Sequence, residues 1–231
     1  MITSQCPAAA ALTTITQAKC AEDFGQIQKL IFQRLTNASG VNTCYAKASG
    51  ASGDLPDLYQ LSSAQALLTA VDSTKIVVTP YIEAPTSEAG DARTSGGGND
   101  SLNGIETLVG ANPSTFSAQI RSQKQSVIKA IKALMGEAKA HNLGVYLINE
   151  NGQIGGLDAY YEYGSTAAAA AATRIAPIPV ELLFVGDKAF GGFEAPDSNA
   201  ISWSFKPQWS DNFFVFKPAY NPLTALDTWE S

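Results

Sequence analysis

The C-terminal quarter of the chain carries two aromatic runs with the pattern of β-strands. In the first run, Ile201, Trp203 and Phe205 alternate with small residues, which is a period of two with one apolar face. The second run contains Phe214 and Phe216, and both runs end in Phe-Lys-Pro. Because proline cannot donate a hydrogen bond to a β-ladder, each proline marks the end of a strand. The region therefore predicts sheet structure and offers little chemistry.

The aromatic side chains of this region have two interpretations. Alternating aromatics most often pack in a core, and we assign five residues to it: Trp203, Phe205, Trp209, Phe214 and Phe216. In the alternative, Trp203, Trp209 and Phe214 form an exposed platform for sugar rings. That alternative would make the protein a carbohydrate-binding or adhesin module.

Upstream, the chain reads as β-rich segments on either side of one helix. Lys75–Ile82 is a β-branched run and predicts a strand, and Asn151-Gly152 predicts a hairpin turn. Residues 23–35 favour a strand, although a helix face fits them equally well. Residues 114–140 repeat apolar residues at helical spacing, with Ser114 as the N-cap. Residues 175–185 predict an edge strand because they contain two prolines.

This order of elements predicts a β-rich α+β fold. We expect a β-sandwich or curled antiparallel sheet flanked by one long amphipathic helix, with extended arms or loops. The length of 231 residues suits a single structural domain, residues 1–231. Residues 1–20 predict an N-terminal arm of small residues.

A long Gly-rich loop or arm is predicted over residues 83–103. So long a polar segment without secondary structure is usually functional or ordered by a partner. We expect it to contact a neighbouring subunit through Glu88, Asp91, Arg93, Gly96, Gly97, Gly98, Asn99 and Asp100.

A basic flank is predicted on the helix, formed by Arg121, Lys124, Lys132 and Lys139. A charged flank is usually a solvated helix face. The alternative is that it docks onto an acidic neighbouring subunit.

Composition narrows the class of partners. Charged residues make up 16% of the chain, below the roughly 25% usual for soluble domains. The formal net charge of −6 argues against adhesive nucleic-acid binding, which needs clustered Lys and Arg. An acidic lining would still let DNA pass without tight binding, because it repels phosphate.

The motifs of common enzymes are missing from the sequence. Gly96-Gly97-Gly98 has no following Lys-Ser/Thr pair, so it is not a phosphate-binding loop. Cys6, Cys20 and Cys44 do not form a paired framework, and with the single His141 they do not suggest a zinc site. We expect no enzyme activity, no catalytic or metal-binding residues and no cofactor. No leader-peptide or membrane-spanning pattern is found, so we expect synthesis in a cytoplasm.

Several local segments resemble virion structural proteins of tailed bacteriophages. They include Gly96–Glu106, Lys129–Met135, Val145–Gly155, Val185–Lys188, Phe193–Phe205 and Trp209–Asp211, within residues 75–220. The layout is most similar to a major tail tube protein, a family with a β-sandwich, one flanking helix and a long arm that reaches the adjacent ring. The resemblance implies stacked homo-oligomeric rings around a DNA-conducting lumen, contacts with other virion proteins, no membrane, and assembly in the host cytoplasm. A head–tail connector or capsid-associated protein is the structural alternative.

Overall fold

Antiparallel β-structure dominates the protein, which we describe from a computed structural model. The structure describes residues 15–17, 24–36, 46–47, 58–100, 104–158, 174–193 and 195–228. The strands are β1 (Ile27–Arg34), β2 (Ala46–Lys47), β3 (Ile76–Val78), β4 (Glu83–Glu88), β5 (Ala92–Gly96), β6 (Glu106–Ala111), β7 (Ser114–Arg121), β8 (Leu143–Asn149), β9 (Ile154–Asp158), β10 (Arg174–Ala176), β11 (Ile178–Ala189), β12 (Ser198–Phe205) and β13 (Phe213–Phe216). The helices are α1 (Leu61–Thr69), α2 (Gln125–Lys139) and α5 (Pro222–Ala225), with 3₁₀ turns η1 (Gly98–Asp100) and η3 (Trp209–Asn212). The predicted β-rich α+β class is confirmed.

Strand β8 is central to the main sheet, where it pairs with β1, β9 and the start of β11. All seven of its residues are buried. Val145 and Leu147 belong to one apolar cluster, whereas Tyr146 and Ile148 belong to another. Because successive side chains of a strand point to opposite faces, a strand that is apolar throughout must be covered on both sides.

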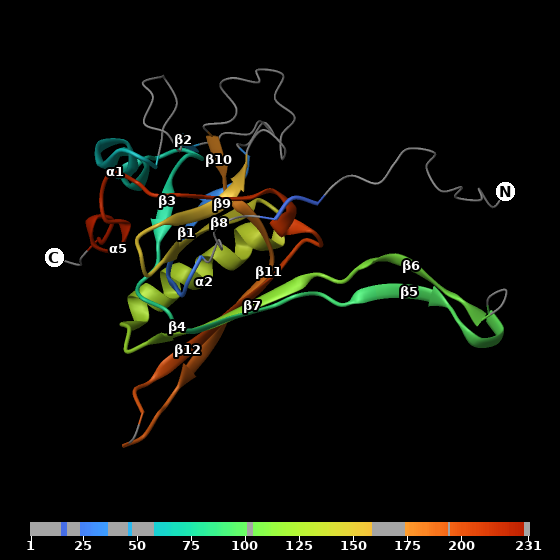
Figure 1. Cartoon of the computed structure of the whole chain (residues 1–231). Coiled ribbons are helices and arrows are strands. Elements are labelled where there is room, and N and C mark those ends of the chain that lie inside the picture. The colour runs from blue at the N-terminus through green and yellow to red at the C-terminus, as the bar shows by residue number, and fades with distance from the viewer. Residues whose placement is uncertain are drawn as a thin grey trace.

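The two apolar clusters are covered by different helices. Ile128 and Ile131 of α2 pack into the first cluster, together with Trp203 and Phe205 of β12. The second cluster takes side chains from α1 and from the segment that contains α5, which lie near each other in Figure 1. The sheet therefore separates α2 from α1 and α5.

Among the residues that the structure describes, one charged side chain is buried. Lys29 of β1 is 1% exposed, and its ammonium group forms an ion pair with Asp227. The same group donates to the carbonyl oxygen of Leu223 at 2.6 Å and lies 4.2 Å from the ring centroid of Tyr81. These contacts hold the C-terminal segment against β1.

The predicted helix over residues 114–140 is wrong in its first part. Residues Ser114–Arg121 form strand β7, and the helix α2 begins only at Gln125, with Lys124 as its N-cap residue. Phe116, Ala118 and Ile120 are buried. The spacing of four between Phe116 and Ile120 fits a helix as well as a strand, and the full-length pairing of β7 with β12 selects the strand.

Other sequence expectations have mixed outcomes. The favoured strand in residues 23–35 is confirmed as β1, and the Asn151-Gly152 turn joins β8 to β9. The residues expected to form an edge strand divide between two strands: Ile175 of β10 pairs with both β2 and β9, whereas β11 pairs with β8 through Ile178 and Pro179 and with β12 through the residues that follow. The predicted N-terminal arm lies outside the described residues except for 15–17.

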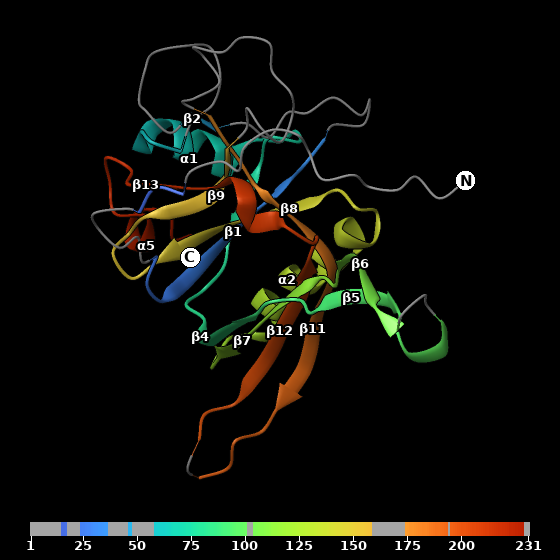
Figure 2. The same cartoon turned by 45° about the vertical axis from the view of Figure 1, so that its right-hand side comes forward.

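Two β-hairpins project from the body of the molecule. Figures 1 and 2 show β5 and β6 extending to one side, and the turn between β11 and β12 extending in another direction. The β5–β6 pair forms its own two-stranded sheet and continues the pairing of β4 with β7. Because these two hairpins extend beyond the core, packing within the body does not account for them.

Candidate functional site

The first projection is an arm, residues 88–112, built as a two-stranded extension. Glu88 pairs with Thr115 at its base, and Ala92 pairs with Ala111 just beyond. Between these pairs, the N–H of Asn112 donates to the carbonyl oxygen of Asp91 at 2.8 Å. A Cβ atom added to Gly90 would lie 1.9 Å from the carbonyl oxygen of Asn112, so the strands can approach this closely only with glycine there.

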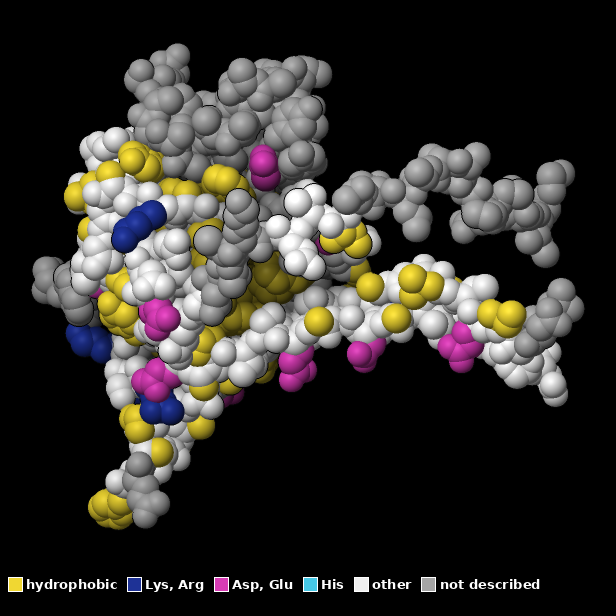
Figure 3. All heavy atoms as spheres, viewed as in Figure 1, with side chains coloured by type: hydrophobic (Ala, Val, Ile, Leu, Met, Phe, Trp, Pro, Cys, Tyr) yellow, Lys and Arg dark blue, Asp and Glu magenta, His cyan; other side chains and the backbone are white. Residues whose placement is uncertain are grey.

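The arm is exposed and carries two kinds of side chain. Ile105, Leu108 and Val109 are 62%, 72% and 61% exposed. A register shift opposite Arg93 and Thr94 places a β-bulge at Val109, and a bulge redirects side chains. Figure 3 shows acidic side chains along one edge of the arm and hydrophobic ones along the opposite edge. An exposed apolar edge of this kind is typical of an interaction surface.

The predicted contact residues all lie in this arm, and they fall on several of its elements. Glu88 ends β4, Arg93 and Gly96 lie in β5, and Gly98, Asn99 and Asp100 form η1 at the far end. Asp91 precedes β5, and Gly97 follows it. Gly96, Gly97 and Gly98 have positive φ angles of 90°, 101° and 56°, which glycine adopts readily.

Sequence reasoning missed the returning strand of the arm. β6 (Glu106–Ala111) supplies half of the hairpin and its most exposed apolar residues. The signal was present, since Ile105 to Val109 reads as extended sequence. Nothing local shows that this run pairs with residues 92–96 and leaves the body.

The second projection, the turn between β11 and β12, carries exposed phenylalanines. Phe190 and Phe193 are 84% and 112% exposed. Upstream in β11, Leu182 adopts a positive φ of 55° at a register shift in its pairing with β12, and it is exposed together with Phe184. The Leu182 bulge changes which side chains of β11 face the core, so that Leu183 is buried.

The predicted basic flank is not one continuous face. Arg121 lies on β7 and its guanidinium is 2.7 Å from a carboxylate oxygen of Glu83, across to β4. Lys132 forms an ion pair with Asp187 of β11 at 2.5 Å. This contact lowers the pKa of Asp187, chiefly through the hydrogen bond from Lys132 and then through its positive charge. Lys139 is exposed in the last turn of α2.

Two further polar contacts join the C-terminal end of α2 to the sheet, an ion pair and a histidine–carboxylate contact. Arg34 at the end of β1 pairs with Glu137, and this hydrogen bond and charge raise the pKa of Arg34. His141 Nδ1 lies 3.0 Å from a carboxylate oxygen of Glu181 in β11.

The predicted core aromatics occupy different depths. Trp203, Phe205 and Phe216 are buried, whereas Trp209 and Phe214 are partly buried against the two clusters. Trp203 stacks on Phe116 at 4.1 Å between ring centroids, and Phe205 stacks on Trp209 at 4.4 Å. These contacts use the ring faces that a sugar platform would need to expose.

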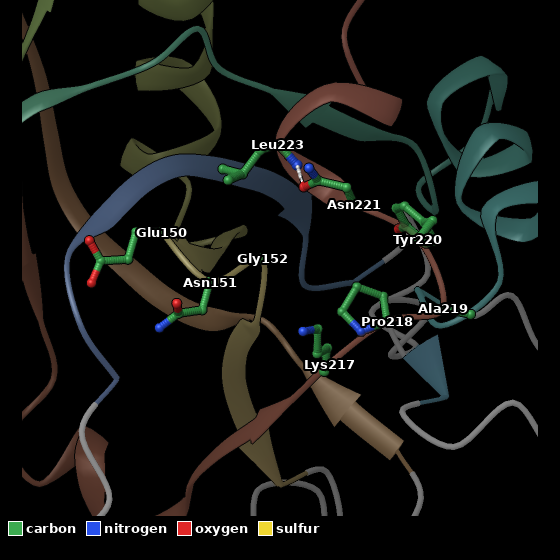
Figure 4. A pocket seen from close by; sticks show the side chains of 9 residues that line it. All are labelled: Glu150, Asn151, Gly152, Lys217, Pro218, Ala219, Tyr220, Asn221 and Leu223. Atoms are coloured by element: carbon green, nitrogen blue, oxygen red, sulfur yellow. Dashed lines mark hydrogen bonds between the residues drawn. The ribbon is translucent and has the colours of Figure 1, made fainter.

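A shallow pocket of about 380 Å³ lies between the β8–β9 turn and the segment that leads into α5. Figure 4 shows Glu150 and Asn151 on one side and Lys217, Pro218 and Tyr220 on the other. The side chain of Glu150 points away from Lys217 in this view. The polar groups therefore do not converge on one point, as those of a small-molecule site would.

The part of the chain that the structure describes contains neither a metal-binding cluster nor a membrane-spanning helix. Among those residues, no group of three or more His, Cys, Asp or Glu side chains is arranged to hold a metal ion. No helix among them is long and apolar enough to cross a membrane. Cys6, Cys20 and Cys44 lie outside the described residues.

Comparisons with known proteins do not identify a family. No family model matches the chain, and no curated protein matches it. A chain from a solved structure described as "Cryo-EM structure of the anti-feeding prophage (AFP) baseplate, 6-fold symmetrised" aligns over 87% of this chain and 99% of that chain, with a TM-score of 0.33 and 6% sequence identity. A likeness at this level carries no argument about the fold or the function of this chain.

Proposed function

We propose that the chain is a non-enzymatic structural subunit of a phage-like particle that assembles with copies of itself. The observation that carries the proposal is the arm, whose apolar side chains Ile105, Leu108 and Val109 lie more than half exposed on a hairpin outside the body. A two-stranded hairpin alone is marginally stable in water. Contact with a partner would bury the apolar edge and stabilise the arm.

In its finer form, the proposal is a tail tube protein that forms stacked rings around a lumen through which DNA passes. An arm that projects from a compact body suits a contact between successive rings. The net charge of −6 suits a lining that repels phosphate. A head–tail connector or capsid-associated subunit would use the same arm within one closed ring or shell.

The burial of Trp203 argues against the rival proposal of a carbohydrate-binding module. Its side chain is 2% exposed and stacks on Phe116 in the core. The alternative sugar platform of Trp203, Trp209 and Phe214 would therefore lack one of its three rings.

The first test is negative-stain electron microscopy of the concentrated protein. Hollow tubes with a regular axial repeat would support the tail tube, and isolated rings would favour a connector. A chain that stays monomeric over the whole accessible concentration range would contradict self-assembly. A glycan-binding screen would then be the next measurement.

A second test removes the arm without disturbing the body. Residues 90–113 are replaced by Asn-Gly, which leaves a two-residue hairpin turn between β4 and β7 because Glu88 and Thr115 are already paired. We expect a folded monomer that no longer assembles. Normal assembly of this variant would refute the role of the arm.

A further inference from the structure

The acidic edge of the arm needs a partner surface of opposite charge. Residues 88–112 contain four acidic side chains, Glu88, Asp91, Asp100 and Glu106, against the single basic Arg93. Figure 3 shows acidic side chains gathered along one edge of the arm. Two surfaces of opposite charge attract each other and fix the register of an interface.

Helix α2 presents a surface of the required kind on this same chain. Lys129 and Lys139 are exposed, and the helix surface between them includes exposed Ala133 and Gly136. A Cβ atom added to Gly136 would meet nothing within 4 Å, so the helix surface there is open and has no side chain that projects from it. An extended strand can approach such a surface closely, with a lysine at either end.

The distance between the two lysines along α2 is close to the distance between two acidic residues along the arm. Lys129 and Lys139 are ten residues apart on a helix that rises about 1.5 Å per residue, which separates them by about 15 Å along its axis. Asp91 lies five residues before Gly96, which pairs directly with Glu106. At about 3.3 Å per strand residue, Asp91 and Glu106 are about 16 Å apart along the arm.

We propose that the acidic edge of the arm of one copy docks on the outer face of α2 of a second copy, with Asp91 and Glu106 facing Lys129 and Lys139. This inference rests on the proposed self-assembly and names the surface that receives the arm. Lys132 has no part in it, because its ammonium group already pairs with Asp187 of the same chain.

Charge reversal tests the contact. In the arm variant, Asp91→Lys and Glu106→Lys are combined, and in the helix variant, Lys129→Glu and Lys139→Glu are combined. Each variant alone should need at least about a tenfold higher concentration to assemble, measured by sedimentation velocity and light scattering at low salt. An equimolar mixture should regain the wild-type concentration, because each reversed arm then meets a reversed helix.

A matched control separates a specific contact from a change in net charge. Lys75→Glu with Lys206→Glu alters two exposed lysines elsewhere and changes net charge as the helix variant does. This control should assemble as the wild type does, and circular dichroism should show all variants folded.

The two proposals fail in different ways. If the wild type assembles and each reversed variant assembles equally well, the arm–helix contact is overturned while self-assembly stands. Loss of assembly that mixing does not restore also overturns the pairing. If the wild type never assembles, the proposed function itself fails.

Discussion

Replacing Asp227 with Asn should destabilise the protein, because it leaves the ammonium group of Lys29 buried without its counter-charge. Lys29 is 1% exposed and cannot turn to water without leaving its position in β1. Its remaining partners would be the carbonyl oxygen of Leu223 at 2.6 Å and the ring of Tyr81 at 4.2 Å. Neither partner carries a negative charge.

The size of the loss in free energy of unfolding follows from the burial of Lys29 and Asp227. Removing one member of a buried ion pair costs about 3–5 kcal/mol. The Asp227 side chain is 19% exposed, so some water reaches the pair and the lower value, about 3 kcal/mol, applies. The free energy of unfolding of a protein of this size falls by about 3 kcal/mol per molar urea, so the urea concentration at the midpoint of unfolding should fall by about 1 M.

Urea unfolding followed by tryptophan fluorescence measures this effect. The double variant Lys29→Met, Asp227→Leu serves as its control, since an apolar pair of similar size should restore most of the lost stability. A free energy of unfolding for Asp227→Asn within 1 kcal/mol of the wild type would refute the reasoning. It would mean that Lys29 reaches solvent when its partner is removed.

Two further predictions concern the arm and helix α2. Gly90→Ala should distort the base of the arm, because its Cβ atom would collide with backbone at 1.9 Å, and it should impair assembly while the body keeps its thermal midpoint; an arm variant that assembles normally would contradict the close approach. The lowered pKa of Asp187 stabilises the folded protein above the unfolded pKa of about 3.8, and this contribution is lost as pH falls through the still lower folded pKa. Below pH 4, the wild type should therefore lose stability faster than Asp187→Asn, in which Lys132 has no carboxylate partner, and parallel melting curves across pH 3–6 would contradict this.

Some elements of the fold follow from local sequence alone. The alternation from Ile201 to Phe205 suffices for β12, because a period of two with one apolar face has no helical counterpart. The Asn151-Gly152 turn between β8 and β9 follows as directly, since Gly152 takes a positive φ of 69° that a tight hairpin favours. In both cases, neighbours in sequence determine the structure.

Where a local sequence pattern fits two secondary structures, pairing in the tertiary structure selects one of them. Phe116 and Ile120 suit a helix until β12 offers a partner along the whole of β7. Pro177 and Pro179 suggest one edge strand, yet residues 175–185 divide between β10 and β11, and the pairing of β11 changes from β8 to β12 along its length. Pairing between distant strands depends on the whole chain, so no local window contains it.

For the arm as well, some properties follow from the sequence and others only from the tertiary structure. Sequence alone determined that residues 83–103 are polar, rich in glycine and without catalytic motifs, because those properties belong to single residues and short spacings. Only the tertiary structure decided that Ala92–Gly96 pair with β6 and that the resulting hairpin leaves the body with an acidic edge and an apolar edge. The register between the two strands and the bulge at Val109 are properties of the pair and of neither strand alone.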